Sequence, residues 1–445
     1  STGAGILVTR TETSTHIATD IFEQVTTKPR VMLVTAVVLA VLAILPGLPF
    51  VPFAVLGAGV AGVAYYILRV PAAEVPGGEA EEEGAELEAS GAGQPPSQEE
   101  EQAEVDDLLT VDAMRLEVGY GLVNLLQTQD MIDRIRSMRR QIAREMGFVV
   151  PPIHIKDNLA LGMNEYRVYI RDGLVASGEV QPNRLLALDS GAVTQQVPGE
   201  NTREPAFGLP AVWIDEAMRD EAAFNGYTVV DPPSALMTHL TEVVRNHGHE
   251  LLSRQSVQHL LDNLAREYPK VVEELVPDKL SLGAVQKVLQ GLLQEGVPIR
   301  DLLTIMETLG DYAPMASTIR TLIEYCRQAL ARVVTQTFSD NQGVLAVVTL
   351  DPELEDQLSQ NLPQREGQEM ALDPNTAQGL IQAANETFQQ ALAEMDQPLL
   401  LTTPALRPHL AELLPPFIQG MRIISTLELT RDAQIKNVAV VRMNQ

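Results

Sequence analysis

Two uncharged apolar runs stand next to each other near the start of the chain, at 31–48 and 50–68. Each is about 18 residues long, or roughly 27 Å as a helix, which is close to the hydrocarbon thickness of a bilayer. The turn Pro46-Gly47-Leu48-Pro49 interrupts any continuous helix between them. The pattern therefore predicts a transmembrane helical hairpin over residues 31–69, with a buried helical hairpin of a soluble protein as the alternative reading.

Basic residues flank this hairpin, with Lys28 and Arg30 before it and Arg69 after it. Because basic residues mark the cytoplasmic side of a span, both ends of the hairpin are expected in the cytoplasm. Residues 1–30 are interpreted as the end of a cytosolic loop. The chain begins with Ser1 and shows no signal-peptide pattern, so we expect a piece that lacks an N-terminal part.

Residues 70–109 have a different composition, with runs of glutamate, pairs of glycine and proline, and almost no apolar clusters. Such a segment cannot bury enough apolar surface to fold. We predict a flexible acidic linker, which acts as a solvated spacer or, as an alternative, recruits a partner.

Beyond the linker, mixed periodicity predicts an α+β subdomain over residues 110–182 that continues at 232–252. Apolar residues at spacings of three and four predict a helix over Asp130–Met146, and strand patterns cover 149–155 and 165–171. Residues 183–231 are richer in glycine and proline and read as a small inserted β-rich subdomain.

Residues 253–338 show almost continuous helical periodicity, and 339–445 alternate strands and helices again, predicting a helical middle subdomain and a second α+β subdomain. Ser281 is a candidate helix cap, Gly296 ends that helix, and Pro298 is expected in the first turn of the next one. In the last subdomain, strands are predicted at 344–350, 398–402, 423–427 and 438–441, and helices at 374–393 and 406–414. The fold class is thus a transmembrane hairpin followed by a multi-subdomain α+β cytosolic domain with a helical middle.

Composition and motifs exclude several functions. A net charge of −27 argues against nucleic-acid binding, which needs a basic surface. There is no phosphate-binding P-loop, and the single cysteine, Cys326, is expected in the core. His247-Gly248-His249-Glu250 lacks the second histidine of a zinc-protease helix and is interpreted as a solvated or capped helix end. No catalytic, cofactor or metal site is predicted, and the chain is not expected to be an enzyme.

One apolar segment, Glu204 to Asp215, contains the only tryptophan, Trp213, and a Phe207 surrounded by prolines and glycine. The prolines keep Phe207 out of a regular helix. From the residues alone, Phe207 and Trp213 are expected to fill a small β core; the alternative is that Phe207 is an exposed binding anchor.

Several ordered segments resemble the FlhA/FHIPEP family of type III secretion export gates. They are Gly5–Arg10, Lys28-Pro29-Arg30, Leu45–Pro49, Glu117–Tyr120, Phe207–Ile214, His247–Gln255, Gln286–Gln290 and Val297–Leu302. The resemblance implies a multi-pass protein of the bacterial inner membrane with a large cytoplasmic domain that forms a ring of nine. It also implies a role in coupling proton motive force to protein export.

The implied partners are export chaperones with bound flagellar substrates, components of the soluble export ATPase complex and other membrane gate proteins. The family's chaperone cleft matches three positions here, Glu204, Phe207 and Thr238, and Glu204 departs from the usual aspartate. The resemblance thereby favours Phe207 as a binding anchor. A flagellar export gate is favoured; a virulence-type injectisome gate and a membrane-anchored signalling or enzymatic protein remain alternatives.

Overall fold

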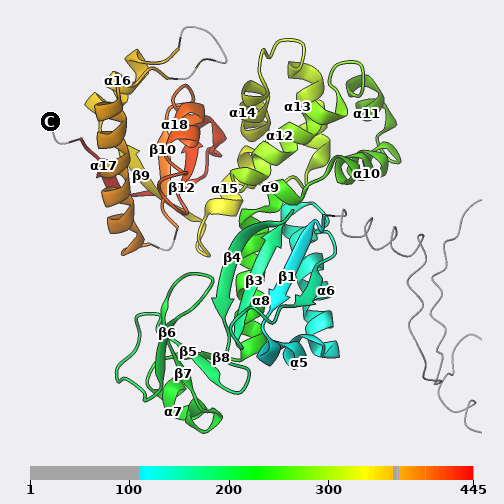
Figure 1. Cartoon of the computed structure of the whole chain (residues 1–445). Coiled ribbons are helices and arrows are strands. Elements are labelled where there is room, and N and C mark those ends of the chain that lie inside the picture. Colours follow the sequence, from blue (N-terminus) through cyan, green and yellow to red (C-terminus); the bar gives the residue numbers. More distant parts are fainter. Residues whose placement is uncertain (1–110, 364–367, 369, 396, 444–445) are drawn as a thin grey trace, which may run out of the picture. The chain divides into compact units, whose positions relative to one another are not determined.

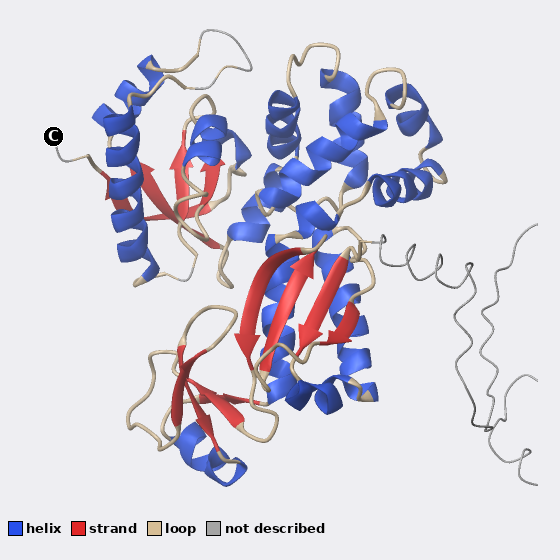
Figure 2. Cartoon of the chain, viewed as in Figure 1, coloured by secondary structure: helices blue, strands red, loops and turns tan. Residues whose placement is uncertain are grey.

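The protein is described by a computed structural model that covers residues 111–363, 368, 370–395 and 397–443. The predicted hairpin, the lead-in and the acidic linker lie outside these residues. None of the helices within them is both long enough and apolar enough to cross a membrane. The strands of the described residues form three four-stranded sheets, and Figure 2 shows them apart from a region made only of helices.

The first sheet has the order β2-β1-β3-β4. Its strands are β1 (Met114–Val118), β2 (His154–Asp157), β3 (Glu165–Ile170) and β4 (Gly173–Glu179). Its helices are η1 (Tyr120–Leu122), α5 (Val123–Leu126), α6 (Gln129–Met146), α8 (Pro232–Asn246) and α9 (Gly248–Leu251). Every second residue of β1 and β3 is buried, as a sheet with one covered face requires. Figure 1 shows α6 and α8 covering that face.

The helix α6 begins and ends where the sequence indicates. The Thr128 side chain accepts a hydrogen bond from the Met131 amide, and Gly147 takes a left-handed φ of 86° after the last turn. The predicted strand at 149–155 is wrong in position, because the strand is His154–Asp157. All four of its residues are exposed, so this edge strand carries no buried alternation for the sequence to reveal.

The inserted sheet has the order β6-β7-β5-β8. It contains β5 (Leu185–Leu188), β6 (Glu200–Arg203), β7 (Pro210–Ile214), β8 (Thr228–Val230), η2 (Glu216–Met218) and α7 (Arg219–Phe224). Alternation along β7 sends Ala211 and Trp213 into the core shared with the first sheet, while Val212 and Ile214 join a small core of their own. Both faces of the inserted sheet are therefore occupied.

The helical region comprises α10 (Arg254–Ala265), α11 (Pro269–Leu275), α12 (Leu282–Gln294), α13 (Leu302–Tyr312), α14 (Ile319–Ala329) and α15 (Ala331–Phe338). Ser281 caps α12 through the Ala284 amide, and Gly296 takes φ 76° after it, as predicted. Pro298 is not in the next helix, however, because Asp301 caps α13 at Leu302. The intervening chain instead crosses to α6, where the Ile299 amide donates to the Met146 carbonyl at 2.8 Å.

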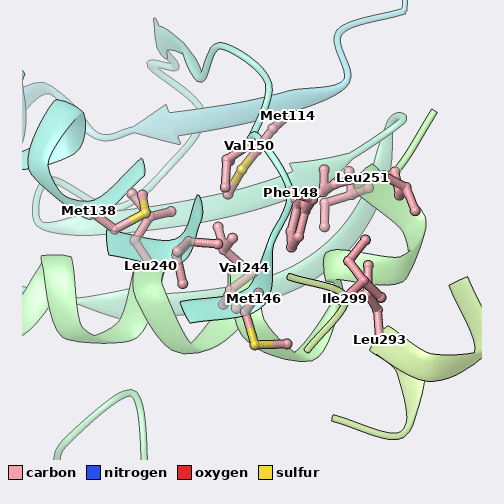
Figure 3. Packing of buried hydrophobic residues seen from close by; sticks show 14 of the residues in the cluster. Met114, Met138, Met146, Phe148, Val150, Leu240, Val244, Leu251, Leu293 and Ile299 are labelled. Atoms are coloured by element: carbon pink, nitrogen blue, oxygen red, sulfur yellow. The ribbon is translucent and has the colours of Figure 1, made fainter. Parts of the chain in front are cut away.

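That crossing joins the helical region to the first sheet through one apolar core. Figure 3 shows Leu293 and Ile299 close to Phe148, Leu251 and Val244. Cys326 belongs to the same core and is fully buried, as expected. Burial raises the pKa of its thiol to about 12, so it stays protonated.

The C-terminal sheet has the order β11-β10-β9-β12, and its strands run parallel. The elements are β9 (Val344–Leu350), α16 (Pro352–Gln360), α17 (Pro374–Leu392), β10 (Leu399–Thr402), α18 (Arg407–Leu413), β11 (Arg422–Ser425), η3 (Thr426–Glu428) and β12 (Gln434–Val441). Val348 and Leu350 of β9 face a core with α17, whereas Leu345 and Val347 face the helical region. Burial on both faces is typical of parallel sheets.

Candidate functional site

A groove runs along the two helices that cover the first sheet. Near one end, Arg134 Nη1 of α6 donates to Ser234 Oγ of α8 at 2.9 Å. Near the other end, Arg245 Nη2 of α8 donates to Glu145 Oε2 of α6 at 2.7 Å. Low-numbered residues of α6 thus meet low-numbered residues of α8, so the helices run parallel. The two contacts are 11 residues apart along each helix, which corresponds to about 16 Å.

The groove has a volume of about 400 Å³ and combines an apolar floor with polar edges. Its lining residues come from α6, α8 and the β6–β7 loop: Arg134, Ser137, Met138, Gln141, Phe207, Ser234, Met237, Thr238, Thr241, Glu242 and Arg245. Met138 and Met237 are buried and supply adaptable apolar surface. The arginines at either end are held by ion pairs, Arg134 with Asp130 and Arg245 with Glu145.

Phe207 is 62% exposed and contributes to this lining from the inserted sheet. It lies in the short loop between β6 and β7, where the next residue, Gly208, takes φ 69°. A side chain at that φ would be strained, so glycine suits the turn. Trp213, six residues later, is 3% exposed. Trp213 is buried as the residues alone predicted, but in the core shared with the first sheet and not in a small β core, and Phe207 is not buried at all.

Glu204 organises the Phe207 loop from inside. It is 4% exposed, and its two carboxylate oxygens accept from the Ala206 amide at 2.9 Å and the Phe207 amide at 2.7 Å. Its own amide donates to the Leu209 carbonyl, and its carbonyl accepts from the Gly208 amide. Because hydrogen bonds to a carboxylate are strong, the Glu204 side chain holds the backbone leading into Phe207, and the Glu204 backbone holds the residues that follow it.

Behind this loop lies a buried polar pair, Tyr166 of β3 and His239 of α8, with 2.7 Å between Tyr166 Oη and His239 Nδ1. Burial, followed by the negative charge of Glu204, raises the pKa of Tyr166. Burial lowers the pKa of His239, against the opposing effects of Glu204 and Glu242. Both rings are therefore neutral near pH 7.

Thr238 lies on α8 with its side chain exposed in the groove. Its hydroxyl donates to the Ser234 carbonyl one turn earlier at 2.9 Å. Phe207, from the β6–β7 loop of the inserted sheet, and Thr238, from α8 on the first sheet, thus line the same groove. Glu204 does not line it.

The His247–Glu250 segment forms the start of α9. His247 Nδ1 lies 2.7 Å from Glu250 Oε1, and the two histidine rings stack. No group of three or more His, Cys, Asp or Glu side chains that could hold a metal ion occurs in the part of the chain that the structure describes.

Comparison with known proteins places this architecture in a family. The model of the FHIPEP family matches residues 1–434.

The chain belongs to the FHIPEP family. Among its relatives, the flagellar biosynthesis protein FlhA of Bacillus subtilis is 37% identical over 454 residues, covering 99% of this chain and 64% of the relative. FlhA of Escherichia coli is 36% identical over 448 residues, covering 99% and 62%. The chain therefore spans less than two thirds of the length of these FHIPEP relatives.

Solved structures share the fold. The Chlamydia pneumoniae CdsV protein aligns with a TM-score of 0.67 at 23% identity, covering 75% of this chain and 98% of CdsV. The nonameric EscV cytosolic domain from the type III secretion system aligns with a TM-score of 0.60 at 19% identity, covering 74% and 97%. At this identity, these structures show the multi-subdomain mixed α/β fold alone.

Two features of this groove were not predicted from the sequence. The first is the pair of arginines at its ends, Arg134 and Arg245, and the second is the methionine floor. Met138 belongs to the apolar periodicity of α6, which indicates burial but does not reveal which helix lies beside it. The 234–245 stretch of α8 must be brought alongside α6 before its lining residues can be recognised.

Proposed function

We propose that this chain is part of the export gate of a flagellar type III secretion apparatus, and that its groove docks export chaperones carrying flagellar substrates. The relatives that support the flagellar branch are named as flagellar biosynthesis proteins and are 34–39% identical to this chain. The structural neighbours CdsV and EscV, at 19–24% identity, are more distant in sequence. These relatives are named for flagellar biosynthesis and secretion and not for an enzymatic reaction.

The single observation that carries the docking proposal is the exposed Phe207 at the edge of a groove with an apolar floor. An exposed aromatic ring held by a structured loop is a typical interface anchor, because little conformational entropy is lost when it is buried. Burying it fully against an apolar partner contributes about 1.5–3 kcal/mol.

The edges of the groove indicate the chemistry of the docked segment. Arg134 of α6 and Arg245 of α8 lie at opposite ends of the helix pair, about three helical turns apart, and Met138, Met237 and Phe207 line the same groove. We propose that the chaperone presents an amphipathic segment whose apolar side chains meet the floor and whose acidic groups meet the arginines. Thr238, with its exposed side chain, lines the same groove as Phe207.

The remaining expectations belong to the same proposal. A nonameric cytosolic domain of EscV, and a complex of CdsV with CdsO, are the precedents for a ring of nine and for a soluble secretion partner. We propose that the predicted hairpin over residues 31–69 places the groove in the cytoplasm of a bacterial inner-membrane protein. Contacts with other gate proteins and with the export ATPase complex, and the coupling to proton motive force, are part of this assignment.

The test is to measure, by calorimetry, the affinity of a purified chaperone–substrate complex for the detergent-solubilised chain. Phe207→Ala is expected to weaken binding about 10- to 150-fold, as loss of about 1.5–3 kcal/mol implies. Phe224→Ala is the matched control, since Phe224 is 91% exposed at the end of α7 and does not line the groove. Equal affinities for the wild type and Phe207→Ala, with unchanged melting, would remove the groove as the docking site.

A further inference from the structure

Five charged side chains, three of them buried and two partly buried, meet where the helical region contacts the C-terminal sheet. Glu295 follows α12, and Glu324 and Arg327 lie on α14; Arg407 lies on α18 and Glu428 on η3. Arg327, Arg407 and Glu428 are at most 1% exposed. We call these five residues the junction cluster.

Arg327 connects the two regions directly. Its Nε donates to Glu428 Oε2 at 2.9 Å, its Nη1 donates to Glu295 Oε2 at 2.8 Å, and its Nη2 donates to the Ile423 carbonyl at 3.3 Å. The other oxygen of Glu428, Oε1, accepts from the Ser425 amide and hydroxyl at 3.1 and 2.8 Å. Both carboxylate oxygens of Glu428 therefore accept hydrogen bonds within the junction.

Arg407 makes the reverse connection, from the C-terminal sheet region into the helical region. Its Nη1 donates to Glu324 Oε1, its Nη2 donates to Glu295 Oε2, and its Nε donates to the Ile423 carbonyl at 3.3 Å. The same guanidinium serves two carboxylates of the helical region. Glu324 and Glu295 therefore share this cation, and Glu295 also pairs with Arg327.

The charges of the junction cluster do not balance when every group is ionised, because three carboxylates face two guanidiniums. The neighbouring cation Arg422 of β11 donates to the Gln294 carbonyl at 3.0 Å, and the charges of Glu242, Glu295 and Arg327 act on it. Because Arg422 is offset by Glu242, adding both leaves the excess of one negative charge unchanged. On the outer side of α14 and α18, Arg320 pairs with Glu412, and His409 lies near both. A buried cluster with one excess negative charge is costly, and protonating one carboxyl group removes that excess.

Of the three carboxyl groups in the junction cluster, that of Glu324 has the fewest ion pairs with arginine, because it contacts only Arg407. Its side chain is 14% exposed, and it shares Arg407 with Glu295. Burial raises the pKa of Glu324 to about 7; Arg407 and Arg327 oppose this, and Glu295 and Glu428 add to it. A proton on Glu324 leaves two carboxylates facing two guanidiniums.

We propose that the junction cluster is a proton-linked latch: Glu324 holds a proton while the helical region and the C-terminal sheet are in contact, and releases it when the contact opens. The inference stands apart from the docking proposal, because no residue of the cluster lines the groove.

The direction of the pH effect follows from linkage. The pKa of Glu324 is higher in the closed junction than the value near 4.5 that the group has in water. The stabilising effect of its proton is complete below that lower value and is lost as the pH rises to about 7. The C-terminal sheet is thus held more tightly in slightly acidic than in slightly alkaline solution.

The test is amide hydrogen exchange of the full chain in detergent between about pH 5.5 and 8.5, corrected for intrinsic exchange rates. The reporters are amides at the junction, such as Thr430, which donates to Thr335 Oγ1 of α15 at 3.2 Å. For one linked proton with a pKa of about 7 in the closed junction, protection falls about 15-fold from pH 5.5 to pH 7 and about 30-fold by pH 8.5, where it levels off. The strand β1 serves as an internal reference, since it contributes no residue to the cluster.

Two variants separate the latch from general pH effects. Glu324→Gln mimics the protonated group, so the decline in protection should disappear and the junction should stay closed at pH 8. Glu412→Gln is the matched control from the exposed pair on the same helices and should keep the wild-type profile. A wild-type profile that is flat below pH 7, or an unchanged slope in Glu324→Gln, overturns the latch. If Glu324→Gln fails to fold, the wild-type profile alone decides.

Discussion

The Phe207 loop and the junction cluster both bury glutamates, but they satisfy the negative charge in different ways. Glu204 is held by backbone amides two and three residues away. Glu428 is held by Arg327, which lies 101 residues away in the sequence, and by Ser425 beside it. The first arrangement shapes one loop, and the second joins two regions of the fold. Loss of the partner should therefore have a local effect in the loop and a global effect at the junction.

The largest expected effect is that of Arg327→Met. Removing the guanidinium leaves Glu428 buried without its main cation, which costs about 3–5 kcal/mol of unfolding free energy. Chemical denaturation of the solubilised chain measures the loss. Arg320→Gln is the control, because the Arg320–Glu412 pair is partly exposed and contributes less than about 1 kcal/mol. Similar losses for the two variants would contradict the distinction between a buried junction and a surface pair.

An intermediate effect is expected for Glu204→Gln. The amide side chain offers one acceptor oxygen where the carboxylate offers two, so either the Ala206 or the Phe207 amide loses its partner, at about 1–3 kcal/mol. The loss should be confined to the loop, with faster amide exchange at 205–209 and unchanged exchange in α6.

The matched control for this substitution is Glu200→Gln on β6. Glu200 forms an exposed pair with Arg184 and a hydrogen bond with Gln181. Its replacement should leave the loop protected. Increased exchange across the whole inserted sheet in Glu204→Gln would show that Glu204 supports the sheet and not the loop alone.

The smallest effect on stability is expected for Phe207→Ala. The ring is largely exposed, so the unfolding free energy should change by no more than about 0.5 kcal/mol. Trp213→Ala, in the same segment, should cost about 3–5 kcal/mol because it empties a core position. Thermal melting of both variants measures the contrast. A large loss for Phe207→Ala would mean that the ring is a packing residue, as the residues alone suggested.

Much of the secondary structure could be predicted because its causes are local. The helix α6 was expected over Asp130–Met146 and covers Gln129–Met146, and the strand at 344–350 matches β9. The cap at Ser281 is a contact within one turn. The helix α16 was not predicted, since only Leu354 and Leu358 of its nine residues are buried and the periodic signal is short.

The candidate site could be predicted only in part. The segment around Phe207 stands out by its prolines, glycine and tryptophan, and the family resemblance adds Thr238. The burial of Glu204 could not be read from the sequence, because it depends on the loop folding back so that its amides reach the carboxylate. Exposure of Phe207 and burial of Trp213 likewise depend on which face of β7 meets the first sheet.

The sequence by itself determined the family, the order of helices and strands over most of the described residues, and the apolar faces that build their cores. These properties arise from periodicity, caps and turns, which act over a few residues. Only the tertiary structure decided that α6 and α8 run parallel with a groove between them, and that Arg327 and Arg407 meet three glutamates at one junction. Such charges come from segments up to 112 residues apart, so their balance exists only after the chain has folded.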